Sequence, residues 1–95
     1  MNRLEIIAVR TYGDYVMQAG TYMRAFCREI RGTSLAGAYL YVNPSVPGDL
    51  AVILSWSSMS VTEQKSDIGL MLSDQLKQFG LVDHVFWIMV DEDEK

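Results

Sequence analysis

Four segments of this chain place apolar side chains on both faces of a β-strand, which is more apolar surface than its two helical segments can cover. A strand with one buried face alternates apolar with polar residues, because successive side chains point to opposite faces. In the first segment, Leu4 and Ile6 point to one face while Ile7 points to the other. Two helices can cover one side of a four-stranded sheet. The other side therefore needs a partner, most economically a second copy of the chain.

The strand-like segments alternate with segments of helical periodicity in the order β-α-β-β-α-β. We expect strands at residues 3–12, 37–43, 50–57 and 82–90, and helices at residues 15–31 and 62–79. This order predicts the ferredoxin-like α+β fold, an antiparallel sheet with strand order 4-1-3-2 and both helices on one face. Asp14 is expected to cap the first helix, and Ser60 with Glu63 forms a capping box before the second. Gly20 and Gly69 lie inside these helices, where glycine either allows close approach to the sheet or leaves space for a cavity.

The loop that contains both prolines predicts a hairpin between the second and third strands. If Val42 lies opposite Leu50, one face of this hairpin is uniformly apolar as far as Trp56, and we expect this face under the helices. The residues on its other face, which we predict to form the interface of a homodimer, include Tyr39, Tyr41 and Ile53. A shift of one residue in the hairpin would exchange part of the two faces.

The composition predicts a single small domain with an acidic end. The chain has 95 residues, which we divide into a ferredoxin-like domain at residues 1–90 and an acidic tail at residues 91–95. Its eight basic and twelve acidic residues give a net charge of −4, of which the tail, with four acidic residues and one basic, contributes −3. No basic surface for nucleic acid, signal peptide or membrane-spanning run is evident. With the single Cys27, these features predict a cytoplasmic protein that binds neither nucleic acid nor membranes.

A Leu-Ser-Trp-Ser-Ser run at residues 54–58 ends the third strand just before a helix. In this run, and in its element order along nearly the whole chain, the protein resembles the antibiotic biosynthesis monooxygenase group of the dimeric α+β barrel class. The resemblance implies that two ferredoxin-like units pack sheet on sheet, with a small-molecule pocket between the sheet and helices of each unit. Trp56 would line that pocket.

The resemblance also bears on cofactors. The class includes cofactor-free oxygenases, haem-degrading enzymes and isomerases. The oxygenases and haem degraders often carry an asparagine on the first strand, and haem degraders need a histidine on the second helix. Residues 3–10 contain no asparagine and residues 62–79 contain no histidine. We therefore expect no haem, no metal and no other cofactor.

Two residues are candidates for catalysis. His84 is the only histidine of the chain, and imidazole is the side chain that most often serves as a general base near neutral pH. The alternative is a hydrogen-bonded or solvated histidine at the end of a strand. Arg10 lies within an apolar strand, where a buried guanidinium would need a carboxylate partner and could hold an anionic oxygen of a substrate.

Aromatic residues at the corner between the first strand and the first helix are candidate substrate contacts. They are Tyr12, Tyr15 and Tyr22, whose hydroxyl groups would need hydrogen-bond partners if buried and could anchor a ligand. The alternative is that they serve packing alone, and the same alternative applies to Trp56.

Two functions follow from these features. The first is a small-molecule enzyme, a cofactor-free monooxygenase-like or isomerase-like protein acting on a small aromatic ligand. The second is a non-enzymatic dimeric module for ligand binding or protein interaction.

Overall fold

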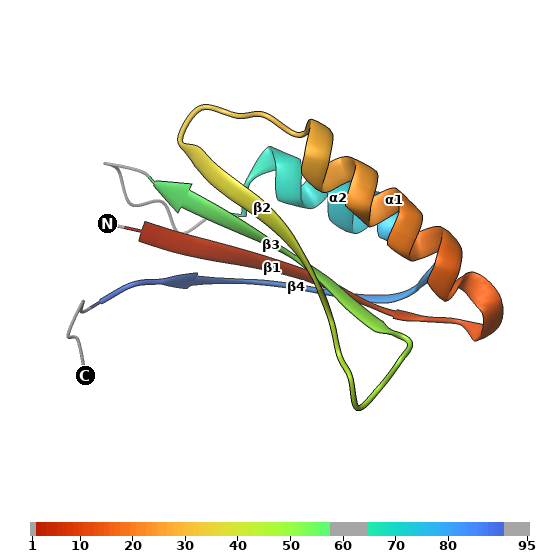
Figure 1. The fold of residues 1–95 in the computed structure, drawn as a ribbon. Helices are drawn as coiled ribbons and strands as arrows, with labels where there is room; N and C mark the ends of the chain where they lie inside the picture. The colour runs from red at the N-terminus through yellow and green to blue at the C-terminus, as the bar shows by residue number, and fades with distance from the viewer. Residues whose placement is uncertain (1, 58–64, 91–95) are drawn as a thin grey trace.

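The structure is a computed structural model that describes residues 2–57 and 65–90. Along the chain it contains β1 (Asn2–Thr11), a 3-10 turn η1 (Gly13–Tyr15), α1 (Val16–Glu29), β2 (Leu35–Val42), β3 (Asp49–Ser57), α2 (Asp67–Leu76) and β4 (Gly80–Ile88). Figure 1 shows one sheet with both helices on the same side. The predicted order of strands and helices is confirmed. No helix of the described residues has the length and apolar character needed to cross a membrane.

The four strands form one antiparallel sheet in the order β2-β3-β1-β4. This is the predicted order 4-1-3-2, counted from the opposite edge. Of the two hairpin registers considered, the structure has the one in which Val42 pairs with Leu50. The loop is closed by the side chain of Asn43, whose Oδ1 accepts the N–H of Ser45 at 2.9 Å. The turn chemistry and the apolar pattern therefore select the same register.

The core lies between the sheet and the helices. Helix α1 packs over β2 and β3, and α2 packs over β1 and β4. The side chains of β3 that point to this layer are Leu50, Val52, Leu54 and Trp56, all of them buried. The predicted assignment of this apolar face to the helix side is confirmed. Neither of the two helices in the described part of the chain covers the opposite face of the sheet.

Both ends of α1 differ from the prediction. Asp14 does not cap the helix, because the chain first forms the 3-10 turn η1, and the residue at the start of α1 is Tyr15, without a side-chain cap. The helix ends at Glu29 because Ile30 turns to extended backbone (φ −68°, ψ 135°). Arg31 still serves the helix end, since its Nη1 donates to the carbonyl oxygen atoms of Arg28 and Ile30.

The second helix and the last strand also have different limits. The predicted capping box of Ser60 and Glu63 lies outside the described residues, and Ser66 caps α2. Strand β4 begins two residues earlier than predicted because Gly80 pairs with Thr11. A Cβ at Gly80 would overlap the carbonyl group of Arg10, so only glycine fits this pairing.

Candidate functional site

The layer between helices and sheet holds a buried pair of ionisable side chains, Glu5 of β1 and His84 of β4. Oε2 of Glu5 and Nε2 of His84 are 2.7 Å apart, and the side chains are 1% and 4% exposed, respectively. Both point toward the helices, because Glu5 pairs with the buried Leu54 and His84 with the buried Ile7. A carboxylate among such neighbours is costly to bury unless it is hydrogen-bonded.

Helix α2 begins directly at this pair. Its N-cap residue is Ser66, whose Oγ accepts the N–H of Gly69 at 2.9 Å. The Ser66 N–H itself donates to Oε2 of Glu5 at 3.2 Å. The N-terminus of a helix carries a partial positive charge, so this position favours a carboxylate. One oxygen of Glu5 is thus engaged by two groups from different parts of the chain.

Gly69 is the residue that allows α2 to lie so close to the pair. A Cβ built at this position would overlap Oε2 of Glu5 and would lie 2.9 Å from Nε2 of His84. No side chain fits there without a shift of the helix or of the pair. Of the two outcomes expected for a helix glycine, Gly69 shows close approach, whereas a Cβ at Gly20 would have open space around it.

Oε1 of Glu5 and Nε1 of Trp56, in the same layer, are buried and make no hydrogen bond in the described part of the chain. Trp56 is only 5% exposed, and the guanidinium carbon of Arg3 lies 5.5 Å from the centre of its ring. Such atoms are rare in folded proteins and call for an explanation.

The chemistry available to this layer is hydrogen bonding. An ionised Glu5 only accepts hydrogen bonds, so Nε2 of His84 then carries the proton between them. Among residues 2–57 and 65–90 there is no group of three or more His, Cys, Asp or Glu that could hold a metal ion. Burial raises the pKa of the Cys27 thiol, which makes Cys27 a poor nucleophile.

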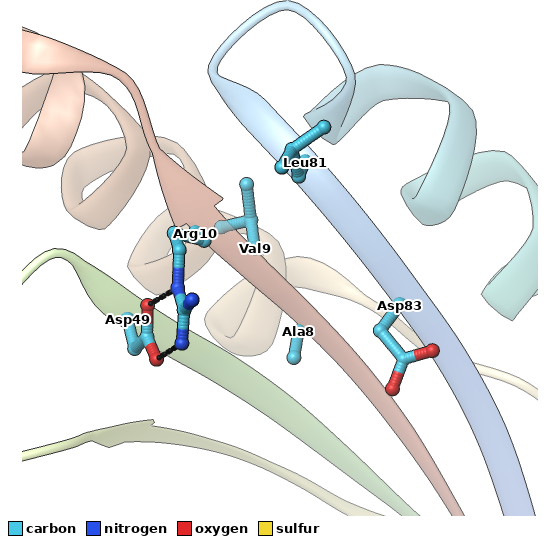
Figure 2. Close-up of a pocket in the computed structure, with 6 residues that line it drawn as sticks. All are labelled: Ala8, Val9, Arg10, Asp49, Leu81 and Asp83. Carbon is cyan, nitrogen blue, oxygen red and sulfur yellow. Dashed lines mark hydrogen bonds and ion pairs between the residues drawn. The ribbon is translucent and has the colours of Figure 1, made fainter. Parts of the chain in front are cut away.

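Arg10, the second predicted catalytic residue, lies on the opposite face of the sheet from His84. Its side chain is 68% exposed rather than buried, and it forms two hydrogen bonds with the carboxylate of Asp49, at 2.9 and 3.0 Å. Figure 2 shows this ion pair beside Ala8, with Asp83 beyond on β4. These residues line a pocket of about 320 Å³. The hydrogen bond from Arg10 holds the pKa of Asp49 below its usual value.

The predicted tyrosine cluster forms, but far from the buried pair. The rings of Tyr15 and Tyr22 lie 6.3 and 5.9 Å from the ring of Phe79, centre to centre. Tyr12 joins them through its N–H, which donates to the carbonyl of Phe79. Tyr12 and Tyr15 are about half exposed and line a shallow pocket with Gln18. The structure therefore does not bring the tyrosines together with His84 or Trp56.

The face of the sheet away from the helices, named the open face below, is largely apolar. Its apolar side chains, placed by the strand pairings, are Leu4, Ile6, Ala8, Tyr39, Tyr41, Ala51, Ile53, Leu81, Val85 and Trp87. The rings at the two edges are the most exposed, with Trp87 at 64%, Tyr41 at 54% and Tyr39 at 51%. The residues predicted for the dimer interface thus lie together on this face.

Glu5 is the residue that sequence reasoning missed. The sequence feature that could have identified it is a single carboxylate on an apolar strand, on the same face as Ile7 and Val9. A charge at such a position needs a partner, and the single histidine of the chain was the nearest candidate on the same face of the sheet. The three residues that the structure gathers in the layer are therefore Glu5, His84 and Trp56, with Glu5 between the other two.

Comparison of this chain with protein-family models gives no match, and comparison with curated proteins gives none either.

Proposed function

We propose that this protein is a homodimeric α+β module that assembles through the open face of its sheet. The observation that carries the proposal is the continuous apolar surface over all four strands, with Leu4, Tyr39, Tyr41 and Trp87 each at least 40% exposed. Burial of such side chains contributes about 25 cal/mol per Å² of apolar surface. Large exposed apolar patches of this kind mark interaction sites in soluble proteins.

The size of the open face suits a stable dimer. Four strands spaced about 4.8 Å apart, with about eight residues each at about 3.3 Å rise, cover roughly 500 Å² in projection. The accessible surface of protruding side chains exceeds the projected area. A typical stable interface buries about 800 Å² on each partner, so the open face approaches this requirement without help from the helices.

The charges of the open face favour a second copy over a charged partner. Its middle rows are uncharged, such as the row that joins Tyr39, Ile53, Ile6 and Val85. The charged groups lie toward one end, where Arg10 is paired with Asp49 and Asp83 lies opposite Ala8. A near-neutral apolar patch can face itself across a two-fold axis, because such an interface uses the same surface on both subunits.

The resemblance noted in the sequence supports the same arrangement, since that class packs two ferredoxin-like units sheet on sheet. The proposal does not depend on an enzymatic activity. It assigns assembly to the open face, whereas the layer under the helices holds the buried core.

A charge placed on the open face tests the proposal. Leu4→Glu and Tyr39→Glu would each bury a carboxylate at the interface, so we expect both variants to be monomers of 10.7 kDa by light scattering. The matched control is Met17→Glu, which changes a side chain on α1 that is 77% exposed and should leave the assembly unchanged. Dissociation by Met17→Glu alone, or persistence of the dimer in both sheet variants, would assign the interface elsewhere.

A further inference from the structure

The pocket on the open face lies between two groups of charged side chains. It measures about 320 Å³ and is lined by Ala8, Val9, Arg10, Asp49, Leu81 and Asp83. Figure 2 shows the Arg10–Asp49 pair on one side of Ala8 and the Asp83 carboxylate on the other. Among the described residues, that carboxylate has no ion-pair or hydrogen-bond partner. A second copy that covers the open face must therefore supply one, because an unpaired carboxylate is costly to bury.

The strand pairings arrange the open face in four rows that run across the strands. In the order β2, β3, β1, β4, the rows are Gly37, Ser55, Leu4 and Trp87; Tyr39, Ile53, Ile6 and Val85; Tyr41, Ala51, Ala8 and Asp83; and, at the charged end on β3, β1 and β4, Asp49, Arg10 and Leu81. In the third row, Tyr41 and Asp83 lie at opposite edges of the sheet with only alanines between them.

A second copy can cover this face in two aligned ways. Sheets that pack face to face in this manner keep their strands within about 30° of each other, so the two-fold axis of the dimer runs either along the strands or across them. An axis along the strands keeps each row over the same row of the partner and reverses the order of the strands. An axis across the strands keeps each strand over the same strand and reverses the order of the rows.

The axis along the strands gives each of these charged groups a partner. It sets β1 over β3 of the other protomer, so Arg10 lies over the partner's Asp49 and Asp49 lies over the partner's Arg10. The two ion pairs, each with an N–O distance of 2.9 Å, then form a ring of alternating charge. The same axis sets β4 over β2 of the other protomer, which brings Asp83 to the partner's Tyr41.

Tyr41 suits the position opposite Asp83 in length and chemistry. Packed sheets lie about 10 Å apart, and the long side chain of Tyr41, which is 54% exposed, can cross most of this gap to the shorter Asp83. Its hydroxyl has no hydrogen-bond partner in the described part of the chain. The ring would occupy the pocket beside Ala8, and the hydroxyl would donate a hydrogen bond to the carboxylate.

The axis across the strands provides none of these contacts. It would place Asp83 over the partner's Val85 and Arg10 over the partner's Leu4. A carboxylate and a guanidinium would then be covered by apolar side chains, which costs free energy. Charges at an interface fix the orientation of the two subunits in this way.

We infer that the second copy binds with the two-fold axis along the strands, and that the Tyr41 hydroxyl of each protomer donates a hydrogen bond to Asp83 of the partner subunit in the pocket beside Ala8. The inference rests on the proposed dimer and goes beyond it by fixing the orientation of the subunits and the polar contacts that select it. Two-fold symmetry makes the contact twice, once at each edge of the interface.

A double-mutant cycle on the dissociation constant of the dimer, measured by analytical ultracentrifugation, tests the contact. Tyr41→Phe removes only the hydroxyl, and Asp83→Ala removes the carboxylate. We expect each single variant to raise the Kd at least about tenfold, and the double variant to raise it no further than the weaker-binding single variant. The matched controls are Tyr39→Phe on the same face of β2 and Asp74→Asn, whose side chain is 75% exposed on α2. Neither control should change the Kd.

Cross-linking tests the orientation without depending on affinity. In chains that carry Cys27→Ala, Tyr41→Cys and Asp83→Cys are made separately, mixed, allowed to exchange subunits and treated with a short bis-maleimide. We expect the mixture to give a cross-linked dimer with one chain of each kind. Asp83→Cys alone should give none, because an axis along the strands puts its two thiols at opposite edges of the interface.

Three results would overturn the inference while the molar mass still shows a dimer. They are additive effects of the two single variants, a tighter dimer for Asp83→Ala, and cross-linking of Asp83→Cys to itself, as the axis across the strands requires. A wild-type chain that stays monomeric would contradict the proposed dimer as well, so molar mass separates the two failures. Circular dichroism reports whether the variants fold, and if Tyr41→Phe or Asp83→Ala does not fold, cross-linking decides alone.

Discussion

At the scale of single residues, Glu5 has the largest consequences. It lies fully buried in the central strand β1, and it joins β4 through His84 and the start of α2 through Ser66. A buried pair of this kind adds little stability compared with well-packed apolar residues, but loss of one partner is strongly destabilising. The Glu5–His84 pair instead specifies where α2 begins and how the Glu5 carboxylate is oriented.

This asymmetry gives a first prediction. His84→Leu leaves the Glu5 carboxylate buried beside the Ser66 N–H alone, and we expect it to lower the free energy of unfolding by about 3–5 kcal/mol. The double variant Glu5→Met with His84→Leu removes both polar groups and should recover most of that loss. Urea unfolding followed by circular dichroism measures both. Equal destabilisation in single and double variants would show that the pair is not coupled.

A second prediction concerns the exposed ion pair on the open face. The pKa of Asp49 is lowered by Arg10, so the pair stabilises the folded state above the unfolded value of 3.8 and loses this effect as the pH falls through the lower, folded value. We therefore expect Arg10→Gln to be less stable than wild type at pH 6 and equally stable at pH 2. The measurement is urea unfolding as a function of pH.

The control for this pH dependence is Lys77→Gln, which removes a cation 3.8 Å from Asp74 on an exposed helix surface. It should change stability little at either pH. A difference between Arg10→Gln and wild type that persists at pH 2 would mean that Arg10 acts through packing instead of through the ionised Asp49.

At the scale of elements, the two helix glycines differ in what surrounds them. Gly69 of α2 lies against Glu5 and His84, whereas a Cβ at Gly20 of α1 would meet nothing within 4 Å. Helix propensity favours alanine over glycine by up to about 1 kcal/mol. Only at Gly20 can this preference act without steric conflict.

The same substitution should therefore have opposite effects in the two helices. We expect Gly20→Ala to stabilise the protein by about 0.5–1 kcal/mol. Gly69→Ala should destabilise it by about 1–3 kcal/mol, because the added methyl group overpacks the layer. Thermal unfolding of the two variants side by side measures both effects. Stabilisation by Gly69→Ala would show that α2 is not seated on the buried pair.

Most of the elements could be predicted from sequence because their signals are local. Apolar runs bounded by turn residues located the four strands, and the register supposed for the hairpin, with Val42 opposite Leu50, is the observed one. The cap at Asp14 was wrong because a 3-10 turn precedes α1, which helical periodicity does not reveal. The pairing of Glu5 with His84 joins residues 79 positions apart, and only the order of strands in the sheet brings them together.

At the scale of the whole molecule, the two faces of the sheet differ in what covers them. The helix side contains the core, the Glu5–His84 pair and Trp56, whereas the open face carries rings that no part of the described chain covers. Small domains bury a limited fraction of their surface, so apolar residues left exposed over four strands are best stabilised by association. The sequence alone predicted more apolar strand surface than the two helices can cover, since both faces of each strand are apolar.

The molar mass of the wild-type chain in solution tests this account most directly. Light scattering on a sizing column at micromolar concentration should give twice the chain mass of 10.7 kDa, or about 21 kDa, for a dimer formed through one two-fold interface. A single species at the mass of one chain, unchanged as the concentration rises, would contradict assembly through the open face.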